Sequence, residues 1–347
     1  MNDDIGFEEA LEQQQRACAM MGSALYAQML VHALDEYRER GPLYRFMEND
    51  PRRERMSMPA VRLLGALHFL ALDEEASQLA AHLPSCGGDA DAAAAWYAAS
   101  ELLEPREREL SVLYADTPQT NEVARSTVLL AGACAIFAQT RLPLRLFDVG
   151  ASAGLNGRLD RYRYEGDGWA WGDPASPLVL RNRTRAGTPA LGDAPIVDRL
   201  GCDVHPLDIA SARDRLRLLS FVWADQLDRV ERLQAAFAAA RHTPMRIDRA
   251  DMFLWIEENA RPRLGSTSVV MHSVVADHLS APARKQLEET IGVLGASASD
   301  DAPFAWLRLE MGERRARFET RVTLWPGAHE TLIARSDGHA QDITWVA

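Results

Sequence analysis

The stretch LRLFDVGASAGLN, residues 144–156, constrains the fold of this chain more than any other segment. An apolar run ends in an acid, Asp148, a glycine-rich turn follows, and an amphipathic stretch begins directly after it. This order predicts a short buried strand, a tight turn at Gly150 and a helix over 154–164. Such a turn places free backbone N–H groups at the carboxyl edge of a parallel sheet, where open α/β sheets bind small molecules.

The rest of the chain divides into two patterns. Residues 1–118 predict an all-helical N-terminal domain, and residues 119–347 predict an α/β domain with an insertion at about 165–200. The expected helices cover residues 7–37, 57–83, 91–103, 121–139, 154–164, 213–221, 228–241 and 282–294. The expected strands cover residues 144–149, 203–207, 245–247, 268–275, 304–309, 322–325, 331–334 and 343–346. Because Pro326-Gly327 and Asp337-Gly338 are hairpin signals, we expect the last strands to be antiparallel.

Composition excludes several classes of protein. A formal net charge of −12 argues against a dedicated nucleic-acid binder, which needs clustered basic charge. The four cysteines form no CxxC pair, and no metal-binding spacing such as HExxH occurs. The acidic N-terminus lacks a signal-peptide pattern, and no apolar run approaches the roughly 20 residues that span a bilayer. We therefore expect a cytoplasmic protein without a membrane or nucleic-acid partner.

The glycine turn has two functional interpretations. Gly150-Ala151-Ser152-Ala153-Gly154 spells the nucleophile elbow of a serine hydrolase, with Ser152 as nucleophile. Four histidines lie downstream in the chain order that a catalytic triad would need: His272, His278, His329 and His339. Asp148, two residues before Gly150, is instead typical of the nucleotide loop of an S-adenosylmethionine (SAM) methyltransferase. A third, purely structural interpretation is a turn that only joins a strand to a helix.

The order of the later elements favours the cofactor loop. Asp248-Arg249-Ala250-Asp251 follows the short third strand, where methyltransferases place an acid or amide near the adenine. The segment 268–279 then fits their fourth strand and the helix after it. An antiparallel hairpin at the end of the sheet is also usual in these enzymes. A nucleophile elbow normally follows an uninterrupted apolar strand, whereas here Asp148 lies inside the end of the strand.

The chain resembles a bacterial family catalogued only as a domain of unknown function, number 2332. The resemblance covers essentially the whole length and rests on QTNEVAR (119–125), FDVGASAGLN with LDRYRY (147–164), WGDP (171–174), VHPLDI with VWADQ (204–226), DRAD (248–251), VVMHSVV (269–275), AWLRLE (305–310) and LWPG (324–327). Gly157 and Ala224 depart from the expected leucine and proline. The family is similar to SAM-dependent methyltransferases in its nucleotide loop, which implies a class I methyltransferase-like, Rossmann-like fold but no established reaction.

These considerations give a set of candidate cofactor-binding residues. We expect the glycine loop to line the methionine part of SAM, Asp148 to reach its ammonium group, and Asp251 to lie near the adenine. An acid at the end of the second strand would bind the ribose; Asp208 and Asp203 are the choices there, although Asp208 lies farther from the glycines than the usual 20 or so residues. The full set is Asp148, Gly150, Ala151, Ser152, Gly154, Asn156, Asp208 and Asp251.

Further candidates would form a pocket wall or act on substrate. His272, at the end of the fourth strand, is a candidate general base, or a satisfied structural histidine. The expected wall residues are Asn121, Glu122, Arg125, Arg158 and Asp225, each with the alternative of a helix cap or a solvated side chain. The leading hypothesis is SAM-dependent methylation of a small-molecule substrate, with a helical lid. The alternatives are a serine hydrolase and a non-catalytic SAM or nucleotide sensor.

Overall fold

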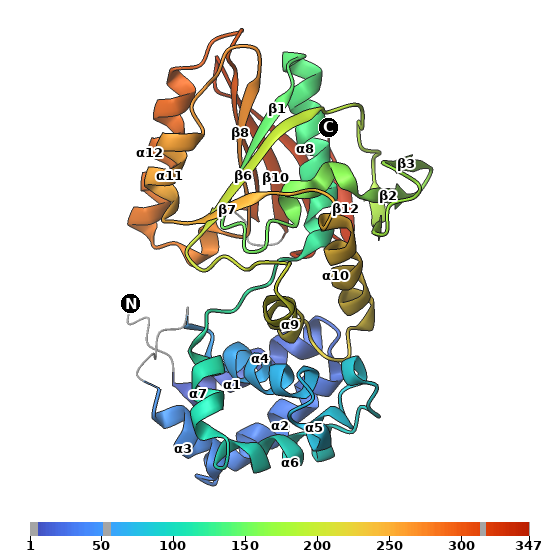
Figure 1. Ribbon diagram of the computed structural model, residues 1–347, viewed down its shortest axis with the longest axis vertical. Coiled ribbons are helices and arrows are strands. Elements are labelled where there is room, and N and C mark those ends of the chain that lie inside the picture. The colour runs from blue at the N-terminus through green and yellow to red at the C-terminus, as the bar shows by residue number, and fades with distance from the viewer. Residues whose placement is uncertain (1–5, 51–56, 313–316, 347) are drawn as a thin grey trace. The chain divides into compact units, whose positions relative to one another are not determined.

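The structure, a computed structural model, describes residues 6–50, 57–312 and 317–346 (Figure 1). The acidic segment 1–5, part of the N-terminus examined for a signal peptide, lies outside them. The chain divides into two compact units. The helical unit comprises Met1–Thr120 and Ala210–Leu233, and the sheet unit comprises Asn121–Ile209 and Gln234–Ala347. The sequence pattern placed 210–233 in the α/β domain, whereas the structure groups this segment with the helices.

The helical unit contains α1 to α7, the 3-10 turn η2, α9 and the first half of α10. Their bounds are α1 Phe7–Met20, α2 Ala24–Arg38, α3 Pro42–Glu48, α4 Pro59–Leu72, α5 Ser77–Ala80, η2 Pro84–Cys86, α6 Ala92–Leu103, α7 Glu107–Ala115, α9 Ala212–Ser220 and α10 Leu227–Ala240. The all-helical character of this region and helix α6, with Asp91 as its N-cap, are confirmed. The helices α3 and α7 are absent from the sequence prediction.

Two predicted long helices are each broken into two. The expected helix 7–37 is interrupted at Gly22, whose φ of +84° turns the chain, and Ser23 then caps α2 by accepting a hydrogen bond from the Tyr26 N–H. The expected helix 57–83 ends at Leu72, because Glu74 adopts a left-handed φ of +60°. Apolar periodicity continued across both breaks and concealed them.

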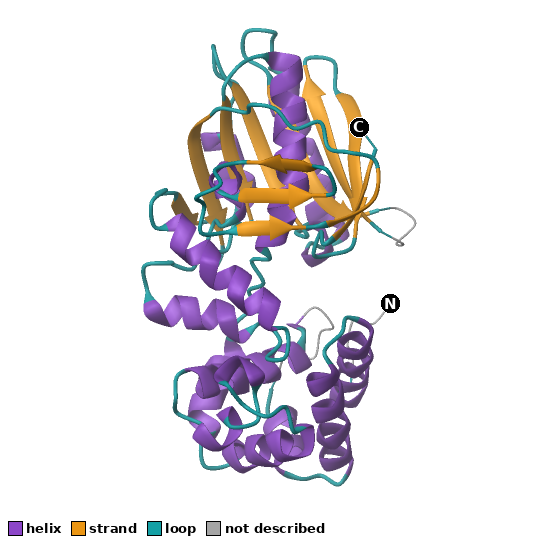
Figure 2. Cartoon of the chain, turned by 90° about the vertical axis from the view of Figure 1, so that its right-hand side faces the viewer, coloured by secondary structure: helices purple, strands orange, loops and turns teal. Residues whose placement is uncertain are grey.

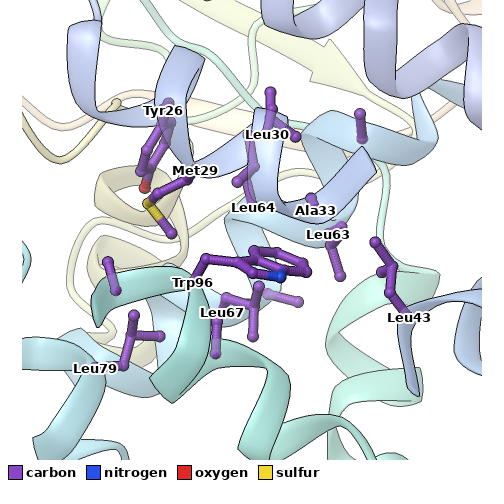
Figure 3. Packing of buried hydrophobic residues seen from close by; sticks show 14 of the residues in the cluster. Tyr26, Met29, Leu30, Ala33, Leu43, Leu63, Leu64, Leu67, Leu79 and Trp96 are labelled. Atoms are coloured by element: carbon purple, nitrogen blue, oxygen red, sulfur yellow. The ribbon is translucent and has the colours of Figure 1, made fainter. Parts of the chain in front are cut away.

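The core of the helical unit packs large aliphatic side chains around Trp96 (Figure 3). Its indole N–H donates to Glu36 Oε2 at 3.0 Å, so the buried ring keeps a polar partner. The segment 210–233 contributes directly to this unit. The Asp225 carboxylate accepts hydrogen bonds from the Ser23 hydroxyl at 2.6 Å and from the Leu25 N–H at 3.0 Å, which fixes the start of α2.

The sheet unit is built on a nine-stranded sheet and a small three-stranded sheet. The strands are β1 Leu144–Val149, β2 Arg163–Gly166, β3 Trp169–Trp171, β4 Val179–Arg181, β5 Arg183–Ala186, β6 Ile196–Asp203, β7 Arg246–Arg249, β8 Thr267–Ser273, β9 Phe304–Met311, β10 Phe318–Trp325, β11 His329–Ser336 and β12 Asp342–Trp345. The helices are η3 Val123–Arg125, α8 Ser126–Thr140, η4 Asn156–Arg161, α11 Met252–Asn259, η5 Ala276–His278 and α12 Ala281–Ala296, with the second half of α10.

The large sheet has the order β5-β12-β11-β10-β9-β8-β1-β6-β7. Neighbouring strands from β7 to β9 are parallel, and β9 to β12 are paired antiparallel. The expected α/β architecture with antiparallel C-terminal strands is therefore confirmed. The five parallel strands β7, β6, β1, β8 and β9 are the third, second, first, fourth and fifth of this set in chain order. Because they are parallel, their carboxyl ends share one edge of the sheet.

Helices cover both faces of this sheet (Figures 1 and 2). Helices α11 and α12 pack against one face, with Leu287 and Ile291 of α12 in a core cluster with Phe147 and Phe304. Helix α8 packs on the opposite face, where a Cβ on Gly132 would lie 2.3 Å from Leu307 Cδ1. The segment 123–140 is long and apolar enough to cross a bilayer, but 67% of it is buried inside the protein, as expected for a core helix.

Two sequence predictions around the insertion are wrong. The second parallel strand is β6, Ile196–Asp203, and not 203–207, so Asp203 and not Asp208 stands at its carboxyl end. The helix expected over 154–164 is replaced by the 3-10 segment η4, with non-helical φ and ψ at Arg158. Strands β2, β3 and β4 form the small sheet, and β5 pairs with β12 at the edge of the large one.

We predict that Gly65→Ala destabilises the protein, because a Cβ on this α4 residue would lie 2.5 Å from Phe221 Cε1. Overpacking of this kind costs about 1 to 3 kcal/mol, which exceeds the helix-propensity gain of about 1 kcal/mol. The matched control is Gly292→Ala in α12, where a Cβ meets no atom within 4 Å, and which should stabilise the protein. The measurement is urea unfolding. Equal stabilisation by both substitutions would contradict the packing of 210–233 against α4.

Candidate functional site

The loop after β1 is conformationally unusual. Gly150 and Gly154 both have φ of +67°, and Ser152 between them has φ of +54°. A Cβ on Gly150 would lie 2.7 Å from Val275 Cγ2, and one on Gly154 would lie 2.8 Å from Ile247 Cδ1. Glycine is therefore required at both positions by backbone conformation and by the close approach of apolar side chains.

The backbone N–H groups of this loop are mostly bonded within the protein. Their acceptors are Cys202 O for Ala151 (3.0 Å), Asp203 Oδ2 for Ser152 (2.8 Å), Ala151 O for Gly154 (2.7 Å) and Asn121 Oδ1 for Leu155 (3.0 Å). The expectation that free loop N–H groups face a ligand is therefore wrong for these four. Neighbouring segments hold the loop in this conformation through these bonds.

Asp148 lies at the end of β1 and is only 4% exposed. Its Oδ2 has no hydrogen-bond partner, which leaves a buried carboxylate oxygen unsatisfied. Burial, reinforced by the negative charge of Asp203 and opposed by Arg158, raises the pKa of Asp148 to about 8. At neutral pH this side chain is therefore mostly the uncharged acid, and a cation placed beside it would favour its ionised form.

Asp203, the last residue of β6, is hydrogen-bonded to this loop. Its Oδ2 accepts from the Ser152 N–H at 2.8 Å and its Oδ1 accepts from the His205 N–H at 2.8 Å. Parallel pairing of β1 with β6 aligns Val149 with Cys202, which brings the two strand ends together. Sequence reasoning gave this position to Asp208, which is exposed and lies five residues past the strand.

Arg158 is buried and is hydrogen-bonded to the loop. The side chain is 3% exposed, and its guanidinium donates to the carbonyl oxygens of Thr243 (2.8 Å), Ala153 (3.1 Å) and Gly154 (2.7 Å). Burial lowers its pKa from the ordinary value. These bonds join the glycine loop to the chain before β7, so Arg158 acts here as a positioning residue.

Of the three predicted wall residues before α8, Asn121 is bonded to the same loop. Asn121 bonds to Leu155 and does not cap the following helix, while Glu122 accepts from the Ala124 N–H at 3.3 Å. Arg125 donates to Gly338 O at 2.9 Å. Asn156 accepts from the Ser126 hydroxyl at 2.8 Å, so the loop is also tied to the start of α8.

The predicted site residues Asp251 and Asp225 belong to different units. Asp251 lies near the same strand ends, because the Ala250 N–H donates to Asp203 O at 3.0 Å, and its carboxylate caps α11 through the Phe253 N–H. Asp225 lies in the helical unit, where it binds the start of α2. Its expected role in a pocket wall stays a prediction.

His272, near the carboxyl end of β8, is 1% exposed and has both ring nitrogens engaged. The Trp306 indole N–H donates to Nε2 at 2.9 Å, and Nδ1 lies 2.6 Å from Glu310 Oε1. Because an indole can only donate, Nε2 must accept, which places the proton of the neutral ring on Nδ1. A general base would need that Nε2 lone pair for its substrate.

A scan against family models matches residues 8–345 to the family described as "Uncharacterized protein conserved in bacteria (DUF2332)". The chain belongs to this family. No curated protein and no solved structure matches the chain significantly. Within residues 6–50, 57–312 and 317–346, no group of three or more histidine, cysteine or acidic side chains is placed to hold a metal ion.

We predict that Asp148→Asn changes how stability depends on pH. Because the folded-state pKa of Asp148 is raised to about 8 from an ordinary 3.8, the wild type loses stability as pH rises from about 4 through about 8. The substituted amide does not titrate. The free energy of unfolding of the variant should therefore rise relative to that of the wild type by on the order of a few kcal/mol over this range, at about 1.4 kcal/mol per tenfold change in the acid dissociation constant.

The measurement is urea unfolding of both proteins between pH 4 and pH 9. Asp167→Asn, at an exposed position between β2 and β3, is the control and should track the wild type throughout. A constant difference between wild type and Asp148→Asn across this pH range would contradict the raised pKa.

Proposed function

We propose that the sheet unit binds SAM at the carboxyl ends of β1, β6 and β7, and that the protein is a SAM-dependent methyltransferase acting on a small molecule. The observation that carries the proposal is the pair of acids beside the glycine loop. Asp148 presents a buried carboxylate oxygen without a partner, and Asp203 stands at the end of the neighbouring strand. Both lie where a doubly wound sheet binds ligands.

The strand order supports a nucleoside-binding fold. The parallel strands follow the order 3-2-1-4-5 of doubly wound sheets, in which the chain reverses direction across the sheet between the first and fourth strands, here β1 and β8. In such folds an acid at the end of the second strand binds ribose hydroxyls. Asp203 occupies that position, and its link to Ser152 fixes it relative to the loop.

The electrostatics favour a cationic cofactor over a phosphorylated one. A pyrophosphate needs free backbone N–H groups, whereas four N–H groups of this loop are already bonded within the protein. The carboxylate of Asp203, bound to the same loop, would also repel it. SAM carries an ammonium and a sulfonium group. Positive charge beside Asp148 would lower the pKa of this residue and favour its ionised form, so the proton would be released to solvent.

The chain's own contribution to methyl transfer would be alignment. Bound SAM would supply an electrophilic methyl group, and an acceptor would need only to be oriented and shielded from water. Arg158 and Asn121 hold the loop rigid through their bonds to its carbonyl and N–H groups. Asp148 would hold the ammonium group, and Asp203 would hold the ribose.

Ser152 supports a second candidate, a serine hydrolase, by its backbone alone. A left-handed φ is a strained conformation that is enriched at functional sites, and a nucleophile elbow is a strained turn. The Ser152 Oγ, however, is buried and makes no hydrogen bond, so no histidine is bonded to it as a base. This arrangement favours the cofactor loop.

We predict that SAM binds the wild type in titration calorimetry, and that Asp203→Asn weakens binding at least about tenfold, because one charge-assisted contact to the ribose is lost. Asp208→Asn is the matched control, since it removes the same charge from the acid that sequence spacing proposed. It should bind as the wild type does.

Three results would overturn the proposal. The first is no binding of SAM or its demethylated product at millimolar concentration. The second is a loss of affinity in Asp208→Asn but not in Asp203→Asn. The third is labelling by a fluorophosphonate probe of the wild type but not of Ser152→Ala, which would establish the hydrolase instead.

A further inference from the structure

A cavity of about 330 Å³ lies on the face of the sheet that carries α12. It is bounded by the ends of β8 and β9, by the first turns of α12, and by charged residues of β10 and β11. This volume is at the small end of the range for ligand pockets, which fits a metabolite-sized molecule. None of the residues proposed to hold SAM lines it.

Aromatic and charged side chains that line this cavity contact one another. The guanidinium of Arg308 lies 3.9 Å from the centroid of the Trp306 ring, and the Trp306 indole donates to His272. Glu310 accepts from the N–H groups of Val275 at 2.9 Å and Ala276 at 3.2 Å in addition to its contact with His272. These aromatic and charged groups therefore hold each other in place.

Most of the negative charge around the cavity is already compensated. Glu310 is engaged by His272 and two backbone N–H groups. Glu319 pairs with Arg321 at 2.7 Å and with Arg335 at 3.0 Å, while Glu330 pairs with Arg308 and Arg321. These three carboxylates are therefore engaged, and Glu288 is the fourth glutamate of the lining. Among the lining arginines, Arg308 and Arg321 are paired, whereas Arg284 has no ion pair with a described residue.

Two arginines that line the cavity have N–H groups beyond those bonded to the protein. Arg284 of α12 donates only through Nε, to Leu279 O at 3.1 Å, and makes no ion pair with any described residue. Since a guanidinium has five N–H donors, four at its two η nitrogens remain. Arg308 donates to Thr323 Oγ1 at 3.1 Å and to Glu330, and burial lowers its pKa, so its charge is poorly solvated.

We infer that this cavity binds a small organic acid, with its carboxylate held by Arg284 and its apolar part against Leu287 and Trp306. A guanidinium matches a carboxylate with two parallel N–H donors, and pairing is strongest where water is partly excluded. The inference does not depend on SAM binding, because Arg284 does not belong to the proposed cofactor site.

The test titrates citrate and benzoate into the wild-type chain without SAM, at constant ionic strength, by calorimetry. We expect binding, with Arg284→Gln weakening it about tenfold through the loss of one charge-assisted contact. Lys285→Gln is the matched control: it is the adjacent residue on the same helix, is exposed, and pairs with Glu289. It should leave affinity unchanged. The Trp306 indole N–H resonance, assigned with Trp306→Phe, should shift on titration in the wild type.

Glu288→Gln gives an independent check, because Glu288 lines the cavity one turn beyond Arg284. Its removal should tighten binding of a pure anion a few-fold by removing repulsion. The inference is overturned by the absence of binding at tens of millimolar, by equal losses in Arg284→Gln and Lys285→Gln, or by weaker binding in Glu288→Gln, which would indicate a ligand with a positive group. Failure of this test leaves the SAM titration unaffected, and the converse also holds.

Discussion

The buried guanidinium of Arg158 fixes the loop on which the candidate site depends. It binds two carbonyl oxygens of the glycine turn and one of the segment before β7, so the loop after β1 is joined to the chain that enters β7. Asp203 and Asn121 bind the same loop through its N–H groups. A buried charge of this kind is tolerated only when its donors are satisfied, and here the satisfied donors define the site's geometry.

The cost of this arrangement falls on Asp148. Its carboxyl group is buried without a partner for Oδ2, and its nearest influences oppose one another: burial and Asp203 favour the neutral acid, while Arg158 favours the anion. A protein that only needed a tight turn could place an apolar residue here. An acid that is kept neutral until a cation arrives is instead consistent with a binding role.

Sequence patterns predicted those elements whose cause is local. The apolar runs identified β1, β8 and β9, the Pro-Gly and Asp-Gly pairs identified the final antiparallel strands, and Asp91 marked the start of α6. The tight turn at Gly150 was predicted correctly, because glycine adopts a left-handed φ more readily than other residues.

The misses have non-local causes. The register of β6 depends on its pairing with β1, and its sequence IVDRLGCD mixes polar with apolar residues, so the acid at its end was misassigned. The helix expected after the glycine loop is replaced by η4, where Arg158 has non-helical φ and ψ and binds two carbonyl oxygens of that loop. The placement of 210–233 in the helical unit depends on contacts such as Asp225 with Ser23, which are 202 residues apart.

The central claim is that a cation-bearing nucleoside binds beside a protonated Asp148. Proton release on SAM binding tests it most directly, through calorimetry at pH 7 in buffers of different ionisation enthalpy. Wild type should release about one proton per SAM bound from Asp148, and Asp148→Asn should lack this release. Equal proton release by the two proteins, at comparable occupancy, would contradict it.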